Sequence, residues 1–176
     1  MANDFLRSVI SREPESLNTL AANKFRLIFH RIPGVTFFCQ TINLPGVNLN
    51  EFQQPTPFAA PVRRPGGGLT LDNLDLTFLI SEDLANYRSL LDWLYAIPPT
   101  VDYSGYNKKH SELYSDATLI VLNSSSRPSF SMKFNDCFPL SIGSVEFQTN
   151  VSDVVPLTCQ ATFAFSRFYF ENIDKL

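Results

Sequence analysis

The side chains most often used for catalysis and metal binding are few in this chain of 176 residues. It contains two histidines, His30 on the polar side of an alternating segment and His110 within the segment KKHSE. The sequence has no HExxH motif, no pairing of His and Cys at metal-binding spacing and no GxSxG motif. We therefore predict no catalytic residue, no metal site and no cofactor, and we expect both histidines to be surface residues of a protein that is not an enzyme.

A run of glycines at Gly66–Gly68 superficially resembles a phosphate-binding loop. No Lys-Ser or Lys-Thr follows it, and the next expected element is a strand, so no helix N-terminus would face an anion. We interpret the run as a flexible hinge, and we expect the adjacent Arg63 and Arg64 to pair with acids at the surface or on another subunit. Four nearby acids are interpreted as strand-face or helix-capping residues instead of a metal site: Asp72, Asp75, Glu82 and Asp83.

The composition indicates one globular domain without a nucleic-acid-binding surface. Hydrophobic residues make up 44% of the chain and charged residues 18%, and a chain of this length buries roughly 70% of its unfolded surface. The net charge of −3 provides no basic surface for phosphates, so any DNA contact should be weak or transient.

The cysteines and the N-terminal segment indicate an intracellular product. Cys39, Cys137 and Cys159 are odd in number and far apart, which fits a reducing compartment, and we expect all three to pack as small apolar residues. The N-terminal segment lacks the continuous apolar stretch of a signal peptide, and nowhere are there 18 consecutive apolar residues. We therefore expect no membrane anchor.

The first half of the chain has strand patterns and one strong helix pattern. Residues 24–32 alternate, and a Pro33-Gly34 turn predicts that they form an antiparallel hairpin with residues 35–43. Residues 69–80 change their apolar parity near Asp72-Asn73, which predicts a bulge. Ser81-Glu82-Asp83 predicts the capped start of an amphipathic helix that ends before Pro98.

The second half is predicted to consist of strands. Residues 117–123 and 129–135 form a hairpin around the turn SSSRP, and a further run begins at Cys137. The last run, residues 156–170, places apolar and polar residues on opposite faces. We predict a mainly β domain over residues 23–176, a sandwich or barrel of two packed antiparallel sheets with one flanking helix, preceded by an N-terminal arm at residues 1–22.

The segment LPGVNLNEFQQPTPFAAPVRRPGGG, residues 44–68, contains five of the twelve prolines and four of the seven glycines. It is predicted to be neither a helix nor a central strand, yet apolar residues are spread along it. A long, apolar and proline-stiffened loop either folds back over its own sheet or contacts another subunit, and the residues by themselves leave both alternatives open. Its apolar side chains are Leu49, Phe52, Phe58 and Val62.

Four features, in this order, resemble the tail tube proteins of contractile-tailed bacteriophages of the T-even type. The hairpin FRLIFHRIPGVTFFCQTINLPG comes first, and the strand-to-helix segment LTFLISEDLANYRSLLDWL follows. The Phe138-Pro139 segment leads into a short strand, and an aromatic-rich final strand closes the domain. The likeness covers about residues 23–171. The chain departs from the pattern in its proline-rich loop, its N-terminal arm and the segment YSGYNKKHSEL.

The resemblance implies a structural subunit that forms hexameric rings around an inner β-barrel, stacked into a tube inside a contractile sheath. It implies assembly in the host cytoplasm, with the tail sheath, baseplate and tail-terminator proteins as partners, and passage of DNA and the tape-measure protein through the lumen of the virion tail. Related tubes, including those of type VI secretion, use the extended loop between subunits and rings. The expected contact residues are Leu49, Phe52, Phe58, Val62, Arg63 and Arg64. The expected lumen-facing residues are Asn73, Asp75, Thr77, Thr158, Gln160 and Thr162.

Other functions stay open at this stage. A tube-like baseplate or terminator ring, or the tube of a secretion system, would share the same fold. A monomeric β-barrel carrier would keep an apolar cavity within one chain, and an enzyme would need a convergent cluster of polar residues that the sequence does not display.

Overall fold

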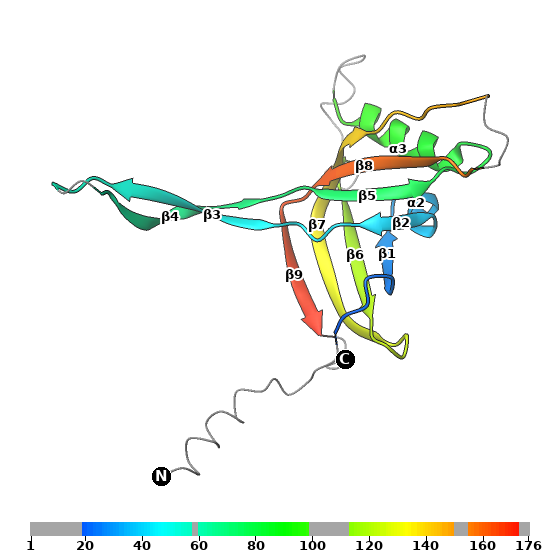
Figure 1. Ribbon diagram of the computed structural model, residues 1–176. Coiled ribbons are helices and arrows are strands. Elements are labelled where there is room, and N and C mark those ends of the chain that lie inside the picture. Colours follow the sequence, from blue (N-terminus) through cyan, green and yellow to red (C-terminus); the bar gives the residue numbers. More distant parts are fainter. Residues whose placement is uncertain (1–18, 58–59, 99–112, 150–154, 173–176) are drawn as a thin grey trace, which may run out of the picture.

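The computed structural model describes residues 19–57, 60–98, 113–149 and 155–172 and is built mainly of antiparallel strands, as predicted (Figure 1). The strands are β1 (Phe25–Phe29), β2 (Cys39–Ile42), β3 (Val47–Gln54), β4 (Val62–Leu71), β5 (Leu74–Leu79), β6 (Ser115–Leu122), β7 (Pro128–Ile142), β8 (Thr158–Ala164) and β9 (Arg167–Asn172), and the helices are α2 (Pro33–Phe37) and α3 (Ala85–Ala96). The expected N-terminal arm lies almost entirely outside the described residues, as does His110.

The long strand β7 joins two layers of sheet. Its first half pairs with β6 and β9, and its second half pairs with β8, so the strand order is β1-β6-β7-β8-β5-β2 with β9 beside β7. In Figure 1, β5 and β8 run across the direction of β6, β7 and β9, and α3 lies along β8. The two predicted sheets are therefore continuous through one strand, while β3 and β4 form a separate two-stranded sheet.

The core lies where the two layers and α3 meet. Phe163 on β8 is fully buried, and its ring centroid lies 5.0 Å from that of Phe29 on β1 and 6.0 Å from that of Trp93 on α3. The predicted alternation is confirmed, because the expected inward-facing residues of β1, β5 and β8 are buried except for Phe25 at the start of β1, which is half-buried. The buried ones are Leu27, Phe29, Leu74, Leu76, Phe78, Cys159, Ala161 and Phe163.

The prediction of a hairpin around Pro33-Gly34 is wrong. Residues 33–37 form the short helix α2 with proline in its first turn, and Val35 is fully buried. Strand β1 pairs with β6, while β2 pairs with β5. Proline is well tolerated at the start of a helix because its missing N–H has no intrahelical partner there. Burial of Val35 against the core therefore favours a helical turn over a tight strand reversal.

Helix α3 begins later than the sequence predicts. Its N-cap is Leu84, at a φ of 56°, and the Asp83 carboxylate accepts a hydrogen bond from the Ala85 N–H at 3.1 Å. The buried side chain of Asn86 holds the segment before the helix in place, because its Oδ1 accepts hydrogen bonds from the Ser81 N–H and hydroxyl.

None of the described helices is long and apolar enough to cross a membrane.

Two strand boundaries also differ from the predictions. The parity change at Asp72-Asn73 is a break between β4 and β5 instead of a bulge within one strand. The final run divides at Phe165-Ser166, where the chain leaves β8 and returns along the first half of β7 as β9. Local alternation locates both changes of direction, but it does not specify which strand each segment joins.

Phe163→Ala should destabilise the fold by about 3–5 kcal/mol, because the cavity would open between the two layers and α3. Denaturant unfolding followed by circular dichroism would measure this loss. Phe37→Ala is the matched control, since Phe37 is 83% exposed and its loss should change stability by less than about 0.5 kcal/mol. Similar losses in the two variants would contradict the placement of the core.

Candidate functional site

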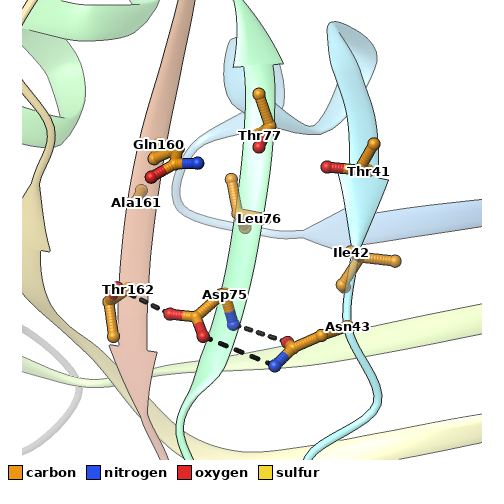
Figure 2. A pocket seen from close by; sticks show the side chains of 9 residues that line it. All are labelled: Thr41, Ile42, Asn43, Asp75, Leu76, Thr77, Gln160, Ala161 and Thr162. Carbon is orange, nitrogen blue, oxygen red and sulfur yellow. Dashed lines mark hydrogen bonds between the residues drawn. The ribbon is translucent and has the colours of Figure 1, made fainter.

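The sheet formed by β2, β5 and β8 has one buried apolar face and one polar face. The register places Asp75 opposite Thr162 and Thr77 opposite Gln160, so their side chains share the face that lies away from Phe163. A shallow depression of about 490 Å³ lies on this face (Figure 2). It is lined by Thr41, Ile42, Asn43, Asp75, Leu76, Thr77, Gln160, Ala161 and Thr162.

Asp75 is the centre of a hydrogen-bond network across the three strands (Figure 2). Its Oδ1 accepts a hydrogen bond from the Thr162 hydroxyl at 2.7 Å, and its Oδ2 accepts one from Asn43 Nδ2 at 3.4 Å. Its backbone N–H donates to Asn43 Oδ1 at 2.6 Å. The single carboxylate is therefore held by β8 on one side and by the end of β2 on the other.

Most of the expected lumen-facing residues lie on this polar face. Thr158 shares it through its pairing with Leu79, whereas Asn73 lies between β4 and β5, where its carbonyl accepts a hydrogen bond from Asn43 Nδ2 at 3.3 Å. The sequence analysis missed Thr41 and Asn43. Their alternation with Ile42 was a usable signal, but the hairpin prediction assigned residues 35–43 to the wrong neighbour.

Residues 44–68 are not an irregular loop, and that prediction is wrong. Most of this segment belongs to the hairpin β3–β4, here called the arm, which projects from the rest of the molecule (Figure 1). Three of the five prolines lie at its tip between the strands, and β3 contains none. Pro65 is tolerated within β4 because both strands of a two-stranded sheet are edge strands.

The three glycines, which the sequence suggests form a flexible hinge, lie at a bulge within β4. The register moves from Leu49 opposite Leu69 to Glu51 opposite Pro65, so Asn50 faces the whole run Gly66–Gly68. A Cβ on Gly66 would lie 2.5 Å from the Asn50 carbonyl oxygen, while one on Gly67 would meet nothing within 4 Å. Glycine at position 66 therefore permits close contact between the two backbones.

The arm carries apolar side chains that its own chain leaves open to solvent. Leu49, Phe52 and Val62, which were expected to make contacts, are 56%, 53% and 46% exposed. Leu69, which the sequence analysis assigned to a strand pattern, is 67% exposed and lies opposite Leu49. Val47 adds a further exposed side chain on the same face as Leu49. Phe58 lies outside the described residues.

The two arginines of the arm interact within the arm. Arg63 Nη1 lies 3.6 Å from the Glu51 carboxylate, and Arg64 Nε donates to Gln54 Oε1 at 3.0 Å. Both residues of the ion pair are well exposed, so the pair adds little stability. These contacts connect β3 to β4 and leave the apolar side chains as the main unused surface of the arm.

Hydrogen bonds hold the root of the arm against the polar face. The Asp72 N–H donates to the Gly46 carbonyl at 3.0 Å, and Asn48 Nδ2 donates to Asp72 Oδ1 at 3.4 Å. Beside them, the Asn43 N–H donates to the Asp75 carbonyl at 3.0 Å. Because Asn43 and Asp75 belong to the polar-face network, the direction of the arm is coupled to that face.

The metal-ligating and nucleophilic side chains of the described residues are dispersed or buried. The described residues contain no group of three or more His, Cys, Asp or Glu side chains that could hold a metal ion. Burial raises the pKa of the Cys39 thiol to about 11 and the pKa of the Cys137 thiol to about 12. Cys137 and Cys159 are buried as expected and Cys39 is half-buried. The notable features are therefore surfaces: the arm and the polar face.

Comparisons with known proteins concern both sequence and fold. Residues 15–171 match the family described as phage tail tube protein, while a comparison with curated proteins finds no significant match. A chain of the anti-feeding prophage cap, which terminates the tube, is similar with a TM-score of 0.66 at 13% identity, over 94% of this chain and 99% of that chain. A chain of the anti-feeding prophage baseplate has a TM-score of 0.65 at 10% identity, over 90% and 99%.

A third similar structure is the sheath–tube complex of PVC, an extracellular contractile injection system, in its extended state. The TM-score is 0.63 at 15% identity, over 94% of this chain and 97% of that chain. At these identities the likeness establishes a common fold.

Gly66→Ala should loosen the arm without unfolding the rest of the protein, because the added methyl group would force β4 away from Asn50. We expect amide hydrogen exchange in β3 and β4 to accelerate by about tenfold or more, while exchange in β5 and β8 stays unchanged. Gly67→Ala is the matched control and should preserve the exchange pattern of the native arm. Equal behaviour of the two variants would contradict the close contact at Gly66.

Proposed function

The chain belongs to the phage tail tube protein family, and on that premise we propose that it is the repeating subunit of a tail tube. In this proposal it forms hexameric rings that stack, and the lumen conducts DNA during ejection. It acts as a structural protein without catalytic activity. The observation that carries the proposal is the projecting arm, whose apolar side chains are exposed in the single chain and would be buried by contact with a second copy.

Burial of the arm would provide the association energy. Fully burying a side chain of the size of Leu, Val or Phe contributes about 1.5–3 kcal/mol. Several such residues on the arm would therefore offset a substantial part of the entropy lost on association. The β-hairpin is already formed in the single chain, and this reduces the further cost of ordering it. We propose Leu49, Phe52, Phe58, Val62, Arg63 and Arg64 as contact residues between subunits or rings. We also propose Val47 and Leu69, because both are exposed on the same arm.

The polar face is suited to line the lumen. Thr, Gln and Asn side chains offer a hydrated surface, and Asp75 places one negative charge per subunit on it. Negative charge at the wall would repel passing phosphates and prevent DNA from binding during transit. We propose that Asn73, Asp75, Thr77, Thr158, Gln160 and Thr162 face this lumen, with Thr41 and Asn43.

The other partners follow from a place in a contractile tail. The protein would contact the sheath on its outside and the baseplate and tail-terminator proteins at the ends of the tube, and it would surround the tape-measure protein. It would assemble in the cytoplasm of the host bacterium and function in the virion.

A second candidate is a single tube-like ring at the baseplate or terminus. It is favoured by the similar structures, which come from a baseplate and a tube-terminating cap as well as from a sheath–tube complex. Localising the chain by labelling in native particles would distinguish signal along the tail from signal at one end.

Removal of residues 51–64 should leave a folded, soluble domain that does not form tubes. The deletion joins Asn50 to Pro65, two positions already close across the arm, and removes no residue of the main sheet. Size-exclusion chromatography with light scattering and negative-stain microscopy would follow assembly. Tubes formed by the deleted chain would refute the role of the arm, and a native chain that stays monomeric at high concentration would refute the tube proposal.

A matched pair of variants makes the test more specific. Leu49→Ser with Leu69→Ser removes two paired apolar side chains from one face of the arm, whereas Thr70→Ser changes a neighbouring residue on the opposite face and keeps its hydroxyl group. Only the first variant should lose assembly. Equal assembly of both variants would show that the face of the arm formed by Leu49 and Leu69 is not a contact surface.

A further inference from the structure

A groove of about 590 Å³ runs along β1 beside α2, on the side of the molecule opposite the arm (Figure 1). One wall consists of residues 25–30, and the other includes Pro33, Thr36, Phe37 and Cys39. Phe37 is 83% exposed, more than any other large apolar side chain in the part of the chain that the structure describes. Its ring contributes an apolar wall to the groove but almost nothing to the core.

The groove follows the outer side of an edge strand. Within the described residues β1 pairs only with β6, and it is the first strand of the sheet order. The Phe29 N–H donates to the Thr36 hydroxyl at 3.0 Å, so α2 already occupies one end of this edge. Toward Phe25 the groove is shaped to receive an extended segment lying along a strand.

The arm of the same chain cannot reach this groove. In Figure 1 the arm extends away from the body on one side, while β1 and α2 lie on the other. Eight residues of β3 span roughly 25 Å, so the arm can instead project onto a neighbouring molecule. An arm on one side and a groove on the other are two different surfaces, and such a head-to-tail contact produces rings or stacks.

Charge and backbone chemistry favour β3 over β4 as the occupant. The groove is lined by Arg26 and His30 and has no acidic residue in its lining. Strand β3, VNLNEFQQ, has no basic residue that would lie against Arg26 and no proline that would interrupt its backbone donors. Strand β4 would bring Arg63 and Arg64 toward Arg26 and lacks an N–H at Pro65.

We propose that the groove between β1 and α2 receives strand β3 from the arm of a second copy of this chain, with Phe37 packing against the apolar side chains of the arm. This inference rests on the proposed function, because it requires the chain to assemble with itself. It identifies the surface that covers the arm and assigns a role to the exposed ring of Phe37.

Photo-crosslinking in assembled tubes tests the contact. The photoreactive amino acid p-benzoylphenylalanine replaces Phe37 in a minor fraction of the copies, and the remaining native copies carry a heavy isotope so that crosslinks between copies are recognised by mass. Assembly is then driven by the native chain. We expect crosslinks from position 37 to residues 47–54 of isotope-labelled copies. The same substitution at Tyr95, which is 68% exposed on α3, is the control and should give no crosslinks to those residues.

The outcomes separate this inference from the proposed function. Tubes in which position 37 crosslinks to other segments, or only to β4, would overturn the groove contact and leave the tube proposal intact. A native chain that forms neither rings nor tubes would overturn both.

A pair of simple variants provides a second measurement. Phe37→Ser should raise the critical concentration for tube formation by at least about tenfold, because one buried aromatic contact is lost per subunit. Tyr95→Ser should leave that concentration unchanged. If Phe37→Ser assembles as the native chain does, Phe37 is not part of the contact and the inference fails.

Discussion

The burial of Phe163 is the constraint on which the rest of the structure depends. Its ring contacts Phe29 from the other layer and Trp93 from α3, so one side chain joins three parts of the fold. Cys159 and Ala161 are buried on the same side of β8. Because side chains alternate along a strand, this burial places Gln160 and Thr162 on the opposite face. The polar face is thus a direct consequence of how the core packs.

The same face positions the arm. Asp75 lies on β5 within the polar surface, and Asn43 connects it to the point where the chain leaves β2 for the arm. Asp72 ties the returning strand to Gly46 at the root. The core cluster includes no residue of β3 or β4. The apolar residues of the arm therefore do not contribute to the core of the single chain and are available for association. Core, polar face and arm are therefore connected by a short series of packed and hydrogen-bonded residues.

The main features of the described residues lie on the surface of the chain. Its described thiols are at least half-buried, and its main hydrogen-bond network holds backbone segments in place. The groove beside Phe37 lies at the opposite side from the arm. A subunit with two distinct complementary surfaces is suited to repeated head-to-tail contacts, whereas a carrier would need an enclosed cavity in one chain.

The sequence by itself determined which residues face the core and which face water in β1, β5 and β8, because alternation is a local property of a strand. For this reason the sequence places Asp75 and Thr77 on the polar side of one strand and Gln160 and Thr162 on the polar side of another, while the pairing of β5 with β8 is what brings them to one face. Tertiary structure decided the partner of each strand. Pro33-Gly34 is compatible with a turn or with the first turn of a helix. The burial of Val35 favours the helix α2, and the strand that follows it, β2, pairs with β5 instead of β1. The sequence did not predict the arm for a related reason. Its prolines are local signals against strand structure, but three of the five lie at the tip between β3 and β4. The close approach of the two backbones at Gly66 exists only once β3 and β4 are side by side.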